Sequence, residues 1–88
     1  MRQTRLAISD GFSHVIKRRR EGRNLSRAAL AALAGLHQTY IGLLERGERS
    51  PNLETAKAIA QALGVSLTEI IEETERVQKK QSGNAQSR

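Results

Sequence analysis

Side chains capable of acid–base or nucleophilic chemistry are few in this 88-residue chain, and they stand far apart. It contains two histidines, His14 and His37, one tyrosine and no cysteine. Neither histidine has an acidic pair or a cysteine at the spacing of metal ligands. No nucleophile has an adjacent base, and no glycine-rich loop could cradle a phosphate. The sequence therefore predicts no enzyme, no metal site, no cofactor and no small-molecule substrate.

Basic side chains are the abundant chemical groups, and they give a net charge of +6 and an isoelectric point near 10.8. Residues 1–60 hold eleven Lys or Arg against five acidic residues, whereas residues 61–88 hold four of each. Such a surface suits a polyanion, although lipid binding or solubility would also use it. No window approaches the roughly 18 apolar residues of a membrane span, and the N-terminus lacks a signal-peptide run. We therefore expect a cytoplasmic protein with no membrane partner.

Apolar residues recur at intervals of three and four, and no run alternates as a strand would. This pattern predicts an all-α fold with an aliphatic core, because only two residues are aromatic. We expect five helices: about 12–23, from the cap Ser26 to Gly35, 38–46 before Gly47, from the cap Asn52 to Gly64, and from the cap Ser66 to about residue 78. Residues 1–10 are expected to form a flexible basic arm, residues 11–78 the domain, and residues 79–88 a disordered tail.

The predicted core residues lie on one face of each helix. They are Phe12, Val15, Ile16, Leu36, Ile41, Leu44, Leu53, Ala56, Ile59, Ala60 and Leu63. On the helical wheel, the outward face of the third helix then carries Gln38, Thr39, Gly42, Leu43 and Arg46.

The chain carries a series of short motifs between Phe12 and Ile71. They are Arg20, Leu25-Ser26, Leu30-Ala31, Ala34-Gly35, QTYI from Gln38, ERG from Glu45, Pro51 and IAQALGVSLTEI from Ile59. In the register of these motifs the chain resembles the Cro and phage-repressor (XRE-type) superfamily of helix-turn-helix regulators over roughly two thirds of its length. The resemblance implies a compact, lambda-repressor-like fold. Its second and third helices would form the helix-turn-helix, and the third would enter the major groove of double-stranded DNA.

The resemblance implies base-reading roles on the third helix for Gln38, Thr39, Tyr40, Leu43 and Arg46. Gln38 either pairs with adenine or is simply an exposed residue at the start of the helix. Arg46 suits a phosphate first and a guanine second. Leu43 either meets a thymine methyl or is simply an exposed leucine, and Tyr40 either packs its ring on the second helix or turns its hydroxyl to a phosphate.

The resemblance also implies contacts with the DNA backbone, from Arg27, His37, Arg49, Ser50 and Asn52. Arg27 replaces a glutamine that is frequent in the family, and a solvated surface charge is the alternative. His37 replaces a serine or threonine cap and is expected to be a weak cap near the phosphates. Arg20 and Glu45 are expected to form a structural ion pair between the first and third helices. Arg2 and Arg5 either enter the minor groove or are disordered.

The stripe on the fifth helix continues past the length needed to close the core, and it is our predicted dimer interface: Leu67, Ile70, Ile71, Thr74 and Val77. One small helix-turn-helix domain reads few base pairs, so a two-fold dimer with recognition helices about 34 Å apart is expected. We therefore predict a homodimeric regulator, repressor or activator, of a palindromic operator. A phage repressor, a restriction-modification controller and an antitoxin remain open, with an unlinked regulatory protein as a further partner. The alternative from another class is a protein-interaction or coactivator module that keeps the fold.

Overall fold

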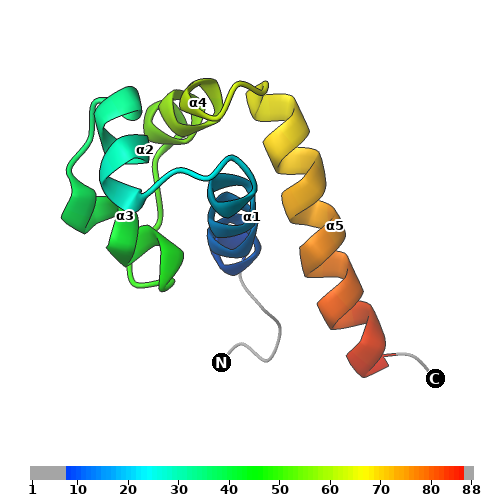
Figure 1. The fold of residues 1–88 in the computed structure, drawn as a ribbon. Coiled ribbons are helices and arrows are strands. Elements are labelled where there is room, and N and C mark those ends of the chain that lie inside the picture. Colours follow the sequence, from blue (N-terminus) through cyan, green and yellow to red (C-terminus); the bar gives the residue numbers. More distant parts are fainter. Residues whose placement is uncertain (1–7, 87–88) are drawn as a thin grey trace.

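Five helices account for the regular structure of residues 8–86 (Figure 1). The computed structural model describes the backbone of residues 8–86 and the side chains of residues 8–80. The helices are α1 (Ile8–Gly22), α2 (Arg27–Ala34), α3 (Gln38–Glu45), α4 (Leu53–Ala62) and α5 (Leu67–Gln86). The described residues contain no strand, as the apolar spacing predicted. None of their helices combines the length and apolar character that crossing a membrane requires.

The three predicted N-caps are confirmed. The side chains of Ser26, Asn52 and Ser66 each accept a hydrogen bond from the backbone N–H three residues later, at 2.9, 2.8 and 3.0 Å. Each bond satisfies one of the amides that the first turn of a helix leaves without a partner. These caps fix where α2, α4 and α5 begin.

Gly35 ends α2 with left-handed backbone angles, φ 73° and ψ 32°. The N–H of Leu36 then donates to the carbonyl of Ala31 at 2.8 Å, and that of Gly35 donates to Ala32 at 3.4 Å. This is the Schellman arrangement, in which a glycine reverses the chain without steric cost. The turn sends the chain directly into α3 and packs Leu36 against the core.

The core is aliphatic apart from Phe12, and every helix contributes to it. Its buried members are Phe12, Val15, Ile16, Leu30, Ala31, Ile41, Leu44, Ala56, Ile59, Ala60, Leu63 and Ile70. The apolar spacing predicted most of them correctly. Leu53 is the exception, since it was predicted to be buried and is 75% exposed. It opens α4, where no neighbouring element covers the first turn on that side.

The long helix α5 packs along α1, on the side of α1 away from α3 (Figure 1). The two helices approach so closely that a Cβ added at Gly11 would lie 3.0 Å from the carbonyl oxygen of Thr74. Thr74 is fully buried, and its hydroxyl donates to the carbonyl of Ile70 at 2.7 Å. The predicted dimer stripe is therefore wrong for Ile70 and Thr74, because both face the interior of their own chain.

Helix boundaries differ from the predictions at three places. α1 begins at Ile8, so residues 8–10 belong to a helix and not to the predicted arm, whose Arg2 and Arg5 lie outside the described residues. α3 ends at Glu45, one residue early. α5 continues to Gln86 through the first eight residues of the predicted tail. Lysine and glutamine favour helix almost as well as leucine, so a polar composition alone did not distinguish tail from helix.

Candidate nucleic-acid interface

The outward face of α3 carries the five residues that were predicted to read bases. Gln38 and Thr39 are exposed in the first turn, and Arg46 is exposed at the C-cap. Tyr40 and Leu43 are only partly exposed, and Tyr40 packs against the core. The face is therefore polar at both ends and apolar in the middle, where Leu43 is partly exposed.

A buried ion pair anchors this helix from behind. Arg20 on α1 donates through Nε to Oε2 of Glu45 at 2.6 Å and through Nη2 to Oε1 at 3.1 Å. Its Nη1 donates to the carbonyl of Leu25 at 2.8 Å. The side chain of Glu45 is 1% exposed and that of Arg20 is 9% exposed. The structure thus brings together the pair that the resemblance implied, and this pair ties α3 to α1 and to the loop before α2.

Arg27 joins the same pair, which the sequence did not predict. Its Nε donates to Oε1 of Glu45 at 2.9 Å, while its side chain remains 43% exposed. Arg27 is therefore paired with a carboxylate of its own chain while part of its side chain stays exposed. Nothing in the spacing of residues 27 and 45 indicates this contact, because it depends on how α2 crosses α3.

The cluster of Arg20, Arg27 and Glu45 keeps all its members charged. Burial acts to raise the pKa of Glu45, but hydrogen bonds from Arg20 and Arg27 outweigh it and lower the pKa below its usual value. The hydrogen bond with Glu45 likewise raises the pKa of Arg20, against the opposite effect of burial. A buried carboxylate held by two guanidiniums fixes the orientation of α3 before any ligand arrives.

Arg46 is held in a different way, on the exposed side. Its Nε donates to Oε2 of Glu48 at 3.0 Å, and both side chains are 55% exposed. The guanidinium folds back over α3, and its Nη1 lies only 3.2 Å from the point where a Cβ at residue 42 would stand. Glycine at position 42 leaves room for this arrangement, and Glu48 occupies the Nε edge of the guanidinium. Neither contact was predicted.

The residues predicted to meet the DNA backbone lie around the two ends of α3. His37 occupies the N-cap of α3 with an extended backbone, as predicted, but its side chain makes no capping hydrogen bond. Arg49 and Ser50 are exposed in the loop before α4. Asn52 uses its Oδ1 to cap α4. The start of α4 thus lies beside two exposed side chains that can donate to phosphate.

Comparisons with known proteins agree with this geometry. The helix-turn-helix family HTH_3 matches residues 16–70. Control protein C.SmaI of Serratia marcescens is 38% identical over 64 residues, which are 73% of this chain and 76% of that protein. The immunity repressor of Bacillus phage phi105 is 34% identical over 67 residues, 76% of this chain and 46% of the repressor.

Solved structures show the same fold. The restriction-modification controller protein C.AhdI from Aeromonas hydrophila matches with a TM-score of 0.70 and 32% identity, over 74% of this chain and 98% of that one. The clp gene regulator ClgR from Corynebacterium glutamicum has a TM-score of 0.88 over 94% of this chain and 88% of its own, but at 18% identity it shows the fold alone. Sequence, fold and the helix pair α2–α3 agree, and the chain belongs to the helix-turn-helix family of XRE-type transcription regulators, which bind DNA and are not enzymes.

Proposed function

We propose that this protein is a cytoplasmic, sequence-specific transcription regulator that binds a palindromic operator as a homodimer. The observation that carries this proposal is the exposed face of α3, held rigidly from behind by the buried Arg20–Glu45 pair. A preorganised helix loses little conformational freedom when it enters the major groove, which favours discrimination between bases.

On that face, Gln38 and Arg46 are the side chains suited to direct readout. Gln38 has an amide that can donate to and accept from adenine. Arg46 has its Nε engaged by Glu48, so its terminal nitrogens are left for two parallel hydrogen bonds to O6 and N7 of guanine. The carboxylate of Glu48 also repels phosphate, and this favours a base over the backbone as the target of Arg46. Thr39, Tyr40 and Leu43 complete the surface with smaller contacts.

The DNA backbone is assigned to residues at the edges of α3. Arg49, Ser50 and the amides at the start of α4 would hold one phosphate stretch, with Asn52 placing that helix start. Arg27 and His37 would meet the backbone near the N-terminal end of α3. Arg27 can do so while it remains bonded to Glu45, because nearly half of its side chain is exposed.

For the homodimer we assign a surface around Leu53 in place of the buried residues of α5. A largely apolar groove of about 360 Å³ runs between the start of α1, the loop before α4 and the middle of α5. Leu53 is 75% exposed and Ile8 is 48% exposed at its rim, and Ile71 lies partly exposed beside them. Exposed apolar groups that gather in this way favour a protein interface. Leu67 and Val77 remain peripheral candidates, since both pack partly on the core.

The biological role best supported is that of a controller of a restriction-modification system. Three of the five significant sequence relatives bear the name control protein, and C.AhdI, which shares the fold at 32% identity, is a controller of this kind. A phage-type repressor is the second candidate, supported by the similarity to the phi105 repressor. Either role operates through occupancy of an operator near a promoter.

Selection of bound sequences from a random pool of double-stranded DNA tests the binding proposal. We expect a consensus with two-fold symmetry and an affinity that falls steeply with salt. Equal affinity for all sequences would instead indicate an interaction module that keeps the fold.

Sedimentation equilibrium tests the dimer surface. Leu53→Gln should shift the protein toward monomer. Leu33→Gln, which changes an exposed leucine on a different helix, α2, should not. Loss of the dimer in both variants, or in neither, would contradict an interface at Leu53.

A further inference from the structure

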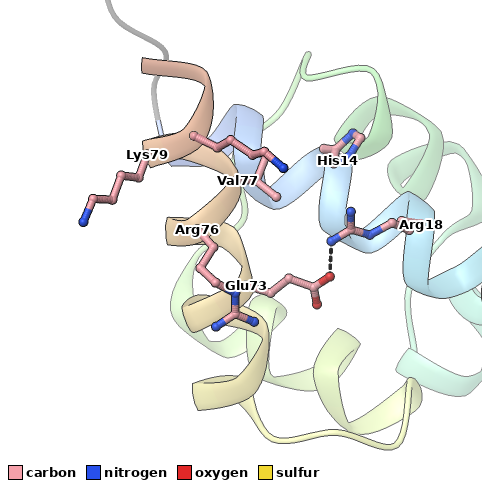
Figure 2. A pocket seen from close by; sticks show the side chains of 7 residues that line it. His14, Arg18, Glu73, Arg76, Val77 and Lys79 are labelled. Carbon is pink, nitrogen blue, oxygen red and sulfur yellow. Dashed lines mark hydrogen bonds and ion pairs between the residues drawn. The ribbon is translucent and has the colours of Figure 1, made fainter. Parts of the chain in front are cut away.

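A second cationic surface lies on the side of the molecule away from α3. It is a groove of about 590 Å³ between α1 and the middle of α5 (Figure 2). Its lining is His14 and Arg18 from α1, and Glu73, Arg76, Val77, Lys79 and Lys80 from α5. We call it the α1–α5 groove. The proposed function uses one of these residues, Val77, as a peripheral candidate for the dimer interface, and it uses none of the charged ones.

The charge of this groove is almost wholly positive, because its single acid is already neutralised. Glu73 is bonded to Arg18, as Figure 2 shows, and its Oε1 accepts from Nε of Arg19 at 2.7 Å. Burial acts to raise the pKa of Glu73, but the bonds from Arg18 and Arg19 outweigh it and lower the pKa. Arg76, Lys79 and Lys80 are exposed, and they belong to none of the ion pairs found among the described residues.

The position of the groove separates it from the DNA-binding face. α1 stands between α3 and α5 (Figure 1), and the main contacts of α5 are with α1 and α4. A double helix lying on the outward face of α3 is therefore on the other side of the molecule from Arg76 and Lys79. The groove remains open when DNA is bound, so its charge is available to a different anionic partner.

The surroundings of the groove favour a narrow anionic chain over a second double helix. Glu72 and Glu75 lie along the other side of Arg76 and Lys79, so the cations form a strip bordered by acids. A duplex that covered this strip would bring its second strand against those carboxylates. Val77, in contrast, places an apolar patch among the cations, and this matches an amino-acid side chain better than a sugar–phosphate chain.

We propose that the α1–α5 groove binds an acidic segment of another protein while α3 is on DNA. Carboxylates of the segment pair with Arg76, Lys79 and Lys80, and an apolar side chain contacts Val77. The groove already holds one carboxylate, that of Glu73, between two arginines, so its geometry suits this group. The inference goes beyond the proposed function, because it gives the DNA-bound regulator a protein partner.

The test uses the full chain and a fluorescein-labelled peptide of repeated Glu-Glu-Val, with the Gln-Gln-Val peptide as the uncharged probe. Fluorescence anisotropy is measured for the free protein and for the protein saturated with double-stranded DNA. We expect the acidic peptide alone to bind, equally in both states. Lys79→Glu should weaken this binding roughly tenfold, since a contacting cation becomes a repelling acid. Lys57→Glu, the same change on α4, should alter it less than about twofold.

Three outcomes would overturn the inference. Competition between the acidic peptide and DNA would place the peptide's site on the α3 face. Equal weakening of peptide binding by both lysine variants would indicate attraction to net charge alone. Weakening of DNA binding by Lys79→Glu as large as that of peptide binding would make the groove part of the DNA surface. Circular dichroism of each variant verifies that α5 remains helical, and Lys80→Glu repeats the test at a second position.

Discussion

Glu45 and Arg46 are neighbours in the chain, yet they belong to two arginine–glutamate groups of opposite character. Glu45 points inward at the end of α3 and is bonded to Arg20 and Arg27, with 1% of its side chain exposed. Arg46 points outward and is bonded to Glu48, with 55% of each side chain exposed. Successive residues of a helix point about 100° apart, so one step along the chain separates a structural cluster from a recognition surface. Burial, and not the pairing itself, decides which group stabilises the fold.

The largest expected effect is that of removing the buried carboxylate. Glu45→Gln removes the buried counter-charge of two guanidiniums and leaves Arg20 only the exposed Glu21, 3.8 Å from its Nη2. Breaking a buried pair in this way typically destabilises a protein by about 3 kcal/mol. Thermal denaturation should show a clear fall in the melting temperature. Glu48→Gln makes the same chemical change in the exposed pair and serves as the matched control, for which we expect less than about 1 kcal/mol.

Arg20→Ala probes the same cluster from its other side. It should lower both the melting temperature and the DNA affinity, because α3 loses its anchor on α1. Unchanged stability together with lost binding would instead place Arg20 at the DNA, and the division between the two groups would then be wrong.

Acid tests the buried group next. The pKa of Glu45 in the folded protein lies below its usual value of 4.5, so the unfolded chain takes up a proton more readily than the folded one. The contribution of Glu45 is therefore complete above pH 4.5 and is lost as the pH falls through the lowered folded pKa. Urea unfolding at a series of pH values should show that Glu45→Gln flattens part of this acidic decline. Glu73 shares the sign, so Glu73→Gln should remove another part.

Arg46→Ala should affect DNA recognition and leave stability unchanged. Loss of a two-bonded guanine contact should lower discrimination at one operator position per half-site by about 1–3 kcal/mol. Arg49→Ala is the comparison, because loss of a phosphate contact should weaken all sequences alike and reduce the salt slope by about one. Binding to operators with single base changes measures both. If the two variants lose the same affinity on every operator, Arg46 does not read a base.

The sequence predicted the parts of this molecule that depend on local rules. Caps at Ser26, Asn52 and Ser66 follow from short-range hydrogen bonding, and the core follows from apolar periodicity. Periodicity gives the direction in which a side chain points but not how far the covering element extends. For this reason Leu53 was wrongly predicted to be buried, and the burial of Ile70 and Thr74 in the core of their own chain was missed.

The recognition surface was predicted less completely, since its contacts depend on helix crossing. The resemblance indicated the positions on α3 and the Arg20–Glu45 pair. It did not indicate that Arg27 shares Glu45, because that contact joins residues of α2 and α3 whose spacing has no helical meaning. Predicting that the Arg46 side chain lies over Gly42 would require its rotamer, which the composition of the loop after α3 does not indicate.

The smallest expected effect is also the sharpest test of the exposed pair. Glu48→Gln removes the carboxylate that holds Nε of Arg46 and repels phosphate, while stability should be unchanged. Arg46 then moves more freely between base and backbone. Affinity for unrelated DNA should rise because a negative charge is lost near the duplex, and affinity for the operator should rise less. The ratio of operator to unrelated-DNA affinity should therefore fall by about twofold to fivefold, an effect below roughly 1 kcal/mol.

Glu54→Gln removes an equal charge from the first turn of α4, away from Arg46, and should raise both affinities together. A fall in the ratio for Glu48→Gln alone would show that Glu48 directs Arg46 to the base, whereas parallel changes in the two variants would reduce Glu48 to one surface charge among several.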